Sequence, residues 1–251
     1  MYNLIILLAC MIPANCANCH NTLQNIDKYC NNCGQKTSVH RLSLHEVWHD
    51  AMHAFLHADK SIIQLTKNLA LRPGTFAKEY IAGKRKKYFN PLSYLVITVA
   101  ISAFVTGYFH LMEGGSGKSP VDNFIERNIN LVFFAAVPIS AMFSTLFFRK
   151  KGYNYAENLV INAFVSGFRI VFYLLIFTPL IIAFRHNFNA VLIIYMALWV
   201  GYLTWAHYEF YEEKLWIIIV KTIAQAALTQ AVIFGLIWCG VTIYFRFFHQ
   251  H

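Results

Sequence analysis

Four cysteines near the start of the chain have the types and spacing of a metal site. Cys16-Ala-Asn-Cys19 and Cys30-Asn-Asn-Cys33 are two CxxC pairs with ten residues between them. Two residues between cysteines let one tight turn direct both thiolates at a single ion, and a second turn completes a tetrahedron. Because sulfur then fills every ligand position, the spacing predicts a structural zinc ribbon or knuckle over 16–36 rather than a catalytic metal. An iron centre and redox dithiols are the alternatives.

The residues around the cysteines support this interpretation. Gly34 follows the second pair directly and suits the positive φ that such a turn requires. The chain has 6 cysteines, so Cys10 and Cys239 remain outside the set. Paired CxxC sequences in a reducing compartment indicate metal binding, whereas disulfide frameworks belong to secreted chains. We therefore expect the zinc ribbon to face the cytoplasm.

A histidine stripe follows the cysteines. The four histidines recur at every fourth residue of a predicted amphipathic helix over 43–59: His45, His49, His53 and His57. Apolar residues lie beside them at helical spacing: Leu44, Val47, Trp48, Ala51, Met52 and Phe55. We expect a helix on the membrane surface with its imidazoles at the polar border. A second metal site or a pH-responsive face is the alternative.

Part of the stripe matches a zinc-peptidase pattern. His45-Glu46-Val47-Trp48-His49 is an HExxH sequence, in which two histidines hold zinc and the glutamate acts as base. The glutamate also has a structural role, because Ser43 and Glu46 have the spacing of a capping box at a helix start. We assign no catalytic residue, and a membrane-associated metallopeptidase using His45, Glu46 and His49 stays an alternative.

The composition indicates that lipid surrounds most of the chain. Of the 251 residues, 57% are hydrophobic and 13% are charged. A soluble domain of this length has about 25% charged residues, and a smaller share leaves too little polar surface to cover a globule in water. The net charge of +9 lies in short clusters beside apolar runs, which is typical of membrane topology signals rather than of nucleic-acid binding.

Five apolar runs are long enough to span a bilayer, which takes about 20 residues. They cover 89–112, 128–148, 159–184, 188–207 and 216–245. The sequence predicts an all-α integral membrane protein with about five transmembrane helices, preceded by the zinc ribbon and the amphipathic helix. The third run carries polar residues in its first half, so it could begin as an interfacial helix, and four or six spans are alternatives.

Two basic clusters predict the orientation. One, adjoining the first run, comprises Lys84, Arg85, Lys86 and Lys87, and the other, Arg149 to Lys151, follows the second run. Both should be cytoplasmic. The N-terminus is then inside and, with five spans, the C-terminus outside. The first cluster could also bind anionic lipid headgroups of the bilayer.

Two cations fall within the apolar runs. Arg169 lies deep in the third run, and Lys221 lies near the start of the fifth. A charge at such a depth usually faces a cavity or a partner, so Arg169 is a candidate functional residue. Lys221 is near enough to its helix start to reach the interface. The acidic residues considered as partners are Glu157, Glu209, Glu212 and Glu213.

The chain divides into four predicted parts. These are a short apolar extension at 1–15, the zinc ribbon at 16–36, cytoplasmic amphipathic and juxtamembrane helices at 43–88, and a transmembrane domain at 89–251. The extension is too short to span a bilayer. An interfacial stretch or a misassigned start is expected, with a lipidated Cys10 as the alternative.

Several motifs together resemble a bacterial family of zinc-ribbon multi-pass membrane proteins of unknown function. They are Cys33-Gly34-Gln35-Lys36, His57-Ala-Asp59-Lys60, Leu71-Arg-Pro-Gly74, the stretch from Glu79 to Tyr88, and Asn90-Pro91. The resemblance covers about 16–94. It implies a cytoplasmic zinc knuckle ahead of several membrane helices, in a bacterial inner membrane, and it implies no substrate.

The leading functional hypothesis is a non-enzymatic inner-membrane protein whose zinc ribbon binds a protein partner, as an adaptor or an assembly factor. A transporter or channel component is the first alternative and the metallopeptidase is the second.

Overall fold

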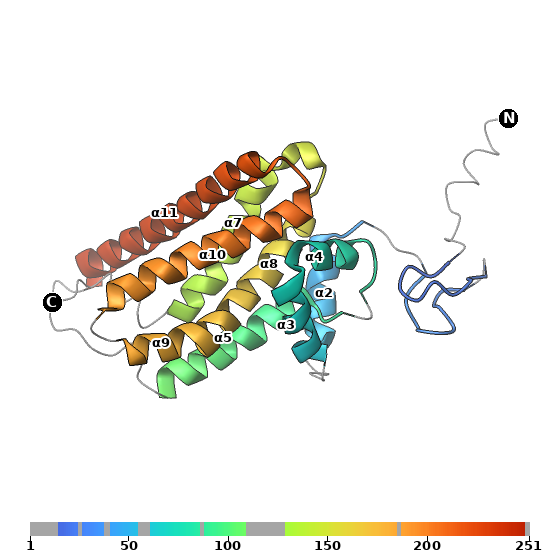
Figure 1. Cartoon of the computed structure of the whole chain (residues 1–251), viewed down its shortest axis with the longest axis horizontal. Coiled ribbons are helices and arrows are strands. Elements are labelled where there is room, and N and C mark those ends of the chain that lie inside the picture. The colour runs from blue at the N-terminus through green and yellow to red at the C-terminus, as the bar shows by residue number, and fades with distance from the viewer. Residues whose placement is uncertain are drawn as a thin grey trace.

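The computed structural model describes residues 15–24, 27–37, 41–54, 61–85, 88–108, 129–184 and 187–248. Within these ranges the regular structure is helical. The elements are α2 (Leu44–Ala54), α3 (Ser61–Leu71), α4 (Pro73–Ile81), α5 (Pro91–Tyr108), α7 (Ile129–Phe147), the short turn η2 (Arg149–Lys151), α8 (Tyr155–Phe172), the π-helical turn η3 (Tyr173–Phe177), α9 (Thr178–Ala183), α10 (Phe188–Tyr211) and α11 (Leu215–Phe248). The predicted all-α class is confirmed, and the long helices lie roughly side by side in one bundle (Figure 1).

Among the described residues, three helical stretches are long and apolar enough to cross a membrane, namely Tyr155–Ala183, Asn189–Tyr211 and Leu215–Ile243. Two further apolar helices, Pro91–Gly107 and Leu131–Phe147, are shorter. The first stretch is central, because 56% of its 18-residue apolar segment is buried inside the bundle. In the last stretch only 11% of the corresponding segment is buried. Because α11 exposes side chains such as Leu236 and Trp238, lipid rather than water is the solvent that suits this surface.

The polar first half of the third run is part of the bundle rather than an interfacial helix. Helix α8 begins at Tyr155, earlier than the predicted 159, behind a capping box formed by Asn154 and Glu157. Asn158 and Asn162 are buried. Asn158 accepts a hydrogen bond of 2.5 Å from the Tyr211 hydroxyl, so polar groups of neighbouring helices satisfy these side chains in the interior.

Helices α2, α3 and α4 cover one end of the bundle, and the cysteine-containing loops lie at this same end (Figure 1). The described residues of both basic clusters also belong to this end, since Lys84 pairs with Glu79 of α4 and Arg149 to Lys151 form η2. Glu212, at the end of α10, pairs with Lys78 of α4 and accepts a hydrogen bond through its carbonyl from Lys151 of η2 at 2.9 Å. The tertiary structure therefore brings to one end the described residues of the two clusters that the sequence predicts to share one side.

The junction of α3 and α4 docks tightly onto α10. The Leu71–Gly74 motif separates the two helices, because Pro73 disfavours helical geometry at the residue before it. Gly74 packs so closely that a Cβ there would lie 2.6 Å from both the Glu209 Cβ and the Phe210 nitrogen. The Glu209 carboxylate accepts hydrogen bonds from the backbone N–H groups of Gly74 (3.0 Å) and Thr75 (3.1 Å). An acidic side chain of α10 thus caps the start of α4.

The core continues from this junction into the bundle. Phe76 and Tyr80 of α4 are fully buried and meet Phe164 of α8 edge to face, at centroid distances of 5.2 Å and 5.5 Å. Gly167 of α8 leaves room for Tyr94 of α5, whose ring would lie 2.6 Å from a Cβ at that glycine. Helix α4 is therefore a part of the folded domain and more than a linker before the first apolar helix.

Candidate metal centre

The two cysteine pairs fold into two equivalent turns. In the first, the N–H of His20 donates to the Cys16 carbonyl at 2.9 Å, and in the second, the N–H of Gly34 donates to the Cys30 carbonyl at 2.7 Å. The residue after each pair has positive φ, 66° at Gly34 and 60° at His20. The predicted role of Gly34 is confirmed. The backbone role of His20 was not foreseen, although it occupies the position in the first pair that the glycine occupies in the second.

Short antiparallel bridges close both turns. Asn15 pairs with Thr22 across the first and Tyr29 with Lys36 across the second. The bridges occupy equivalent positions in the two halves, so the four-cysteine module is an internal repeat of one turn. The identical CxxC spacing is the signal of this repeat, since Cys16-Ala-Asn-Cys19 and Cys30-Asn-Asn-Cys33 differ at one position.

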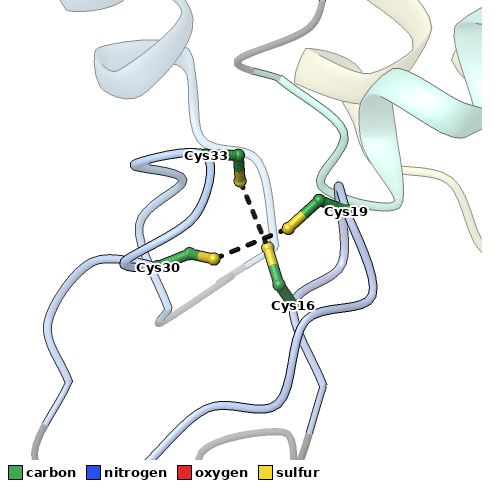
Figure 2. A group of neighbouring side chains, drawn as sticks. All are labelled: Cys16, Cys19, Cys30 and Cys33. Atoms are coloured by element: carbon green, nitrogen blue, oxygen red, sulfur yellow. Dashed lines mark hydrogen bonds between the residues drawn. The ribbon is translucent and has the colours of Figure 1, made fainter.

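The four thiols converge on one point (Figure 2). The Sγ atoms of Cys16 and Cys33 are 3.6 Å apart, those of Cys19 and Cys30 are also 3.6 Å apart, and all four lie within 4.8 Å of one another. A tetrahedral ion with Zn–S bonds of about 2.3 Å requires sulfurs about 3.8 Å apart. These distances also exclude disulfides, whose sulfurs are about 2.0 Å apart. The geometry therefore fits a metal ion held by four cysteines.

The surroundings of the sulfurs differ between the two turns. Burial raises the pKa of the Cys16 thiol to about 11. A hydrogen bond from the Asn18 side chain contributes most to lowering the pKa of Cys33 to about 6, and a hydrogen bond from the backbone of Cys33 contributes most to lowering the pKa of Cys30. Hydrogen bonds to sulfur favour the thiolate, which is the form that binds metal.

The donor set is closed and the local core is small. Among the described residues, only Leu23 joins Cys16 and Cys30 in the buried cluster of this segment, with Cys19 and Cys33 partly buried beside it. So few apolar contacts do not fold a segment alone, which is why small four-cysteine modules depend on their metal. Four sulfur ligands suit Zn²⁺ and also an iron centre, and they leave no coordination position for a substrate.

The predicted capping box at the start of α2 is confirmed. The Glu46 carboxylate accepts a hydrogen bond from the Ser43 N–H at 3.1 Å, and the Glu46 N–H donates to the Ser43 hydroxyl at 3.3 Å. The exposed rings of His45 and His49 stack, with centroids 6.2 Å apart. His53 is described only in its backbone, within α2, and His57 lies outside the described residues. In the described part of the chain, only the cysteines gather three or more metal-ligating side chains.

Helix α2 uses its apolar face in two ways. Val47 is 1% exposed and packs into the core, whereas Leu44 is 50% exposed and Trp48 is 63% exposed. Asn90, just before α5, donates a hydrogen bond to the Val47 carbonyl at 3.3 Å. Val47 of the predicted face therefore docks onto the bundle, whereas Leu44 and Trp48 stay on the surface.

The first basic cluster has a local acidic partner. Of its four residues, Lys84 and Arg85 lie within the described ranges, and Lys84 pairs with Glu79 at 3.4 Å. Burial acts to raise the pKa of Glu79, but a hydrogen bond from Tyr88 and the charges of Arg72 and Lys84 outweigh it, so the pKa is lowered. The role of Lys84, Arg85, Lys86 and Lys87 in binding lipid headgroups stays a prediction.

The acidic residues considered for Arg169 all have other partners. Glu157 pairs with Arg41, Glu209 caps α4, Glu212 pairs with Lys78, and Glu213 pairs with Lys221 at 2.7 Å. Pairing of Lys221 with one of these carboxylates is confirmed. None of these four candidate carboxylates pairs with Arg169 in the described structure. They lie at the end of the bundle that carries α4, while Arg169 lies at the midpoint of Tyr155–Ala183.

One protein family matches the chain, over residues 59–103, and its description is "Protein of unknown function (DUF3667)". The matched range covers α3, α4 and most of α5, and it includes the Leu71–Gly74 motif but none of the four cysteines. No curated protein and no solved structure matches the chain. The similarity to a family of unknown function thus falls on the segment that docks onto α10.

Proposed function

We propose that this chain is an inner-membrane protein whose cytoplasmic zinc ribbon binds a protein partner, as an adaptor or an assembly factor. The observation that carries the proposal is the closed set of four cysteines, within 4.8 Å of one another, in a small module at the basic end of the bundle. Four thiolate ligands organise a backbone and present its surface, and they offer no open position for chemistry. Zinc is the proposed ion because four-cysteine tetrahedral sites are its usual structural sites.

The proposed topology has five spans. Helices α5 and α7 are counted as spans together with the three longer stretches. Five alternating spans then bring to one end the starts of α5, α8 and α11 and the ends of α7 and α10. That end carries Arg149 to Lys151 and Lys84, and the positive-inside rule makes it cytoplasmic. A reducing cytoplasm also keeps the four thiols free to bind metal.

Tyr29 is the proposed contact residue of the zinc ribbon. Its backbone bridges Lys36, while its side chain is 60% exposed. Exposed tyrosines often contribute most to protein interfaces, because they bury a large area with little loss of side-chain entropy.

The test combines metal content with partner capture from membranes. Cys30→Ser should lose its zinc and the partner together. Tyr29→Ala should keep a single zinc ion per chain and lose the partner, which separates recognition from folding. Cys239→Ser is the matched control, because Cys239 is exposed on α11, and it should keep both. Two results refute the adaptor function. Either all three variants capture the partner equally, or neither the variants nor the wild type captures any partner.

A further inference from the structure

The middle of the bundle holds a positive charge to which the described residues offer no carboxylate. Arg169 lies at the midpoint of the stretch Tyr155–Ala183, about 20 Å from either end at 1.5 Å per residue. Its side chain is too short to reach either interface from there. A charge at this depth is unfavourable unless it faces a cavity or a partner, so such residues usually mark functional sites.

Aromatic rings hold the guanidinium in place. Its carbon lies 4.8 Å from the ring centroids of both Phe133 and Trp199, and 5.6 Å from that of Tyr195. Nε donates a hydrogen bond to the Tyr195 hydroxyl at 2.9 Å. Rings stabilise the guanidinium through its faces, whereas its N–H groups point outward in its plane. In the described part of the chain this is the one hydrogen bond shown for Arg169, so the donors on its terminal nitrogens are available to an acceptor.

A cavity adjoins this guanidinium. It holds about 50 Å³, within a wider depression of about 540 Å³ when the open space at its mouth is included. Four helices line it, with polar side chains from Ser140, Asn162, Ser166, Arg169, Thr229 and Gln230 and with apolar walls that include Phe133, Trp199 and Leu203. A single water needs about 10–15 Å³, so the inner cavity has room for a headgroup of a few atoms.

Two buried polar atoms of α11 add an independent observation. The Thr229 hydroxyl belongs to a residue that lines the cavity and is 5% exposed, and it has no hydrogen-bond partner among the described residues. Gln225, one turn earlier and fully buried, donates to the Ser140 hydroxyl at 2.8 Å, but its own Oε1 accepts no hydrogen bond within the part of the chain that the structure describes. Buried polar groups without partners are rare in folded proteins. An unsatisfied hydroxyl and a cation without a carboxylate thus face the same cavity.

We propose that this cavity binds an oxyanion, a carboxylate or a phosphate, with Arg169 as its counter-charge and the Thr229 hydroxyl as a second donor. Arginine suits this role because its planar fork matches the oxygens of both groups. The apolar walls and the depth in the bundle favour an oxyanion carried on an apolar chain, such as that of a fatty acid or an anionic lipid. A free anion entering from water has the same headgroup chemistry.

The test measures binding to the purified full-length chain in an uncharged maltoside detergent. Trp199 reports on the site, since its ring lies against the Arg169 guanidinium. The probes are decyl phosphate, inorganic phosphate and decanol, which separate the amphiphile, the free anion and the apolar chain. The wild type should show saturable quenching by decyl phosphate, absent from Trp199→Phe. Competition by inorganic phosphate at similar concentrations identifies a free anion as the ligand, and failure to compete identifies a lipid-borne one.

Three variants decide the assignment. Arg169→Gln should raise the Kd for decyl phosphate at least tenfold, and Thr229→Val should raise it severalfold while preserving the side-chain volume. Lys221→Gln is the matched control, because this second cation of the apolar runs is already paired with Glu213, and its Kd should stay within twofold of the wild type. If Arg169→Gln fails to fold, Thr229→Val measured against Lys221→Gln decides. Equal affinity in the wild type and both cavity variants, or binding no stronger than that of decanol, overturns the proposal and leaves Arg169 a packing residue.

Discussion

Replacing Gly74 by alanine tests whether α4 docks onto α10 as described. The new Cβ would lie 2.6 Å from the Glu209 Cβ and the Phe210 nitrogen, and closer still to the Ala206 carbonyl oxygen. Two of these neighbours are backbone atoms of a long helix and cannot rotate away as a side chain would. Helix α4 must therefore move outward, and its hydrogen bonds of 3.0 Å and 3.1 Å to the Glu209 carboxylate lengthen.

The expected destabilisation follows from two terms. Overpacking a tight contact costs about 1–3 kcal/mol, and hydrogen bonds to a charged acceptor contribute about 1.5–3 kcal/mol. Because moving the helix relieves part of the overlap while it breaks the hydrogen bonds, we expect a total of about 2–5 kcal/mol rather than the full sum. For a chain of this size that is a fall in melting temperature of about 5–15 °C.

The assay is thermal unfolding of the purified chain in detergent, followed by size-exclusion chromatography. Gly201→Ala is the control, because Gly201 lies on α10 as well and a Cβ there meets nothing within 4 Å. It should melt at or slightly above the wild-type temperature, since alanine favours a helix over glycine by about 0.5–1 kcal/mol. Glu209→Ala should lower stability alone but add little to Gly74→Ala. If Gly74→Ala has the same melting temperature as the control, α4 does not pack against α10 as closely as the structure shows.

Three further outcomes follow from the same structure. Arg41→Gln removes the bidentate partner of Glu157, whose side chain is 7% exposed, so in the same assay we expect a lower melting temperature because a buried carboxylate loses its cation, with the exposed Lys150→Gln as an unchanged control. The lowered pKa of Glu79 stabilises the fold above pH about 4.5, and this stabilisation is lost as the pH falls through the lower folded-state pKa. The difference in melting temperature between the wild type and Glu79→Gln should therefore vanish in acid. A difference that does not change with pH would contradict this. A single cysteine introduced at Asn187 should react with an impermeant maleimide added outside the cell. One introduced at Lys150 should react only after permeabilisation. Labelling of both positions from one side would refute the five-span topology.

Local chemistry allowed much of the N-terminal half to be predicted. The spacing of Cys16, Cys19, Cys30 and Cys33 was sufficient to place four thiols on one point, because a CxxC turn has few backbone solutions. The Ser43–Glu46 capping box and the positive φ of Gly34 were foreseen for the same reason. Each of these features depends on residues a few positions apart.

Contacts between distant segments were not predictable in this way. The sequence suggested a juxtamembrane role for the Leu71–Gly74 motif, but no local pattern shows that Glu209 caps the helix after it. Partners for Arg169 were sought among acidic residues because opposite charges attract, whereas the fold supplies aromatic rings and a hydroxyl from other helices. Apolar periodicity identifies a helix but carries no information on which neighbour it faces.

The sequence by itself determined that this is a helical chain with long apolar stretches, a four-cysteine module and basic clusters beside the apolar runs, since composition, ligand spacing and charge clusters act over short ranges. Only the tertiary structure decided what the buried polar groups do. It assigned the four carboxylates to other partners, docked α4 onto α10 through a glycine, and left Arg169 beside a cavity at the centre of the bundle. The physical reason is that the free energy of a buried charge depends on the groups around it in space, and packing of distant segments determines which groups those are.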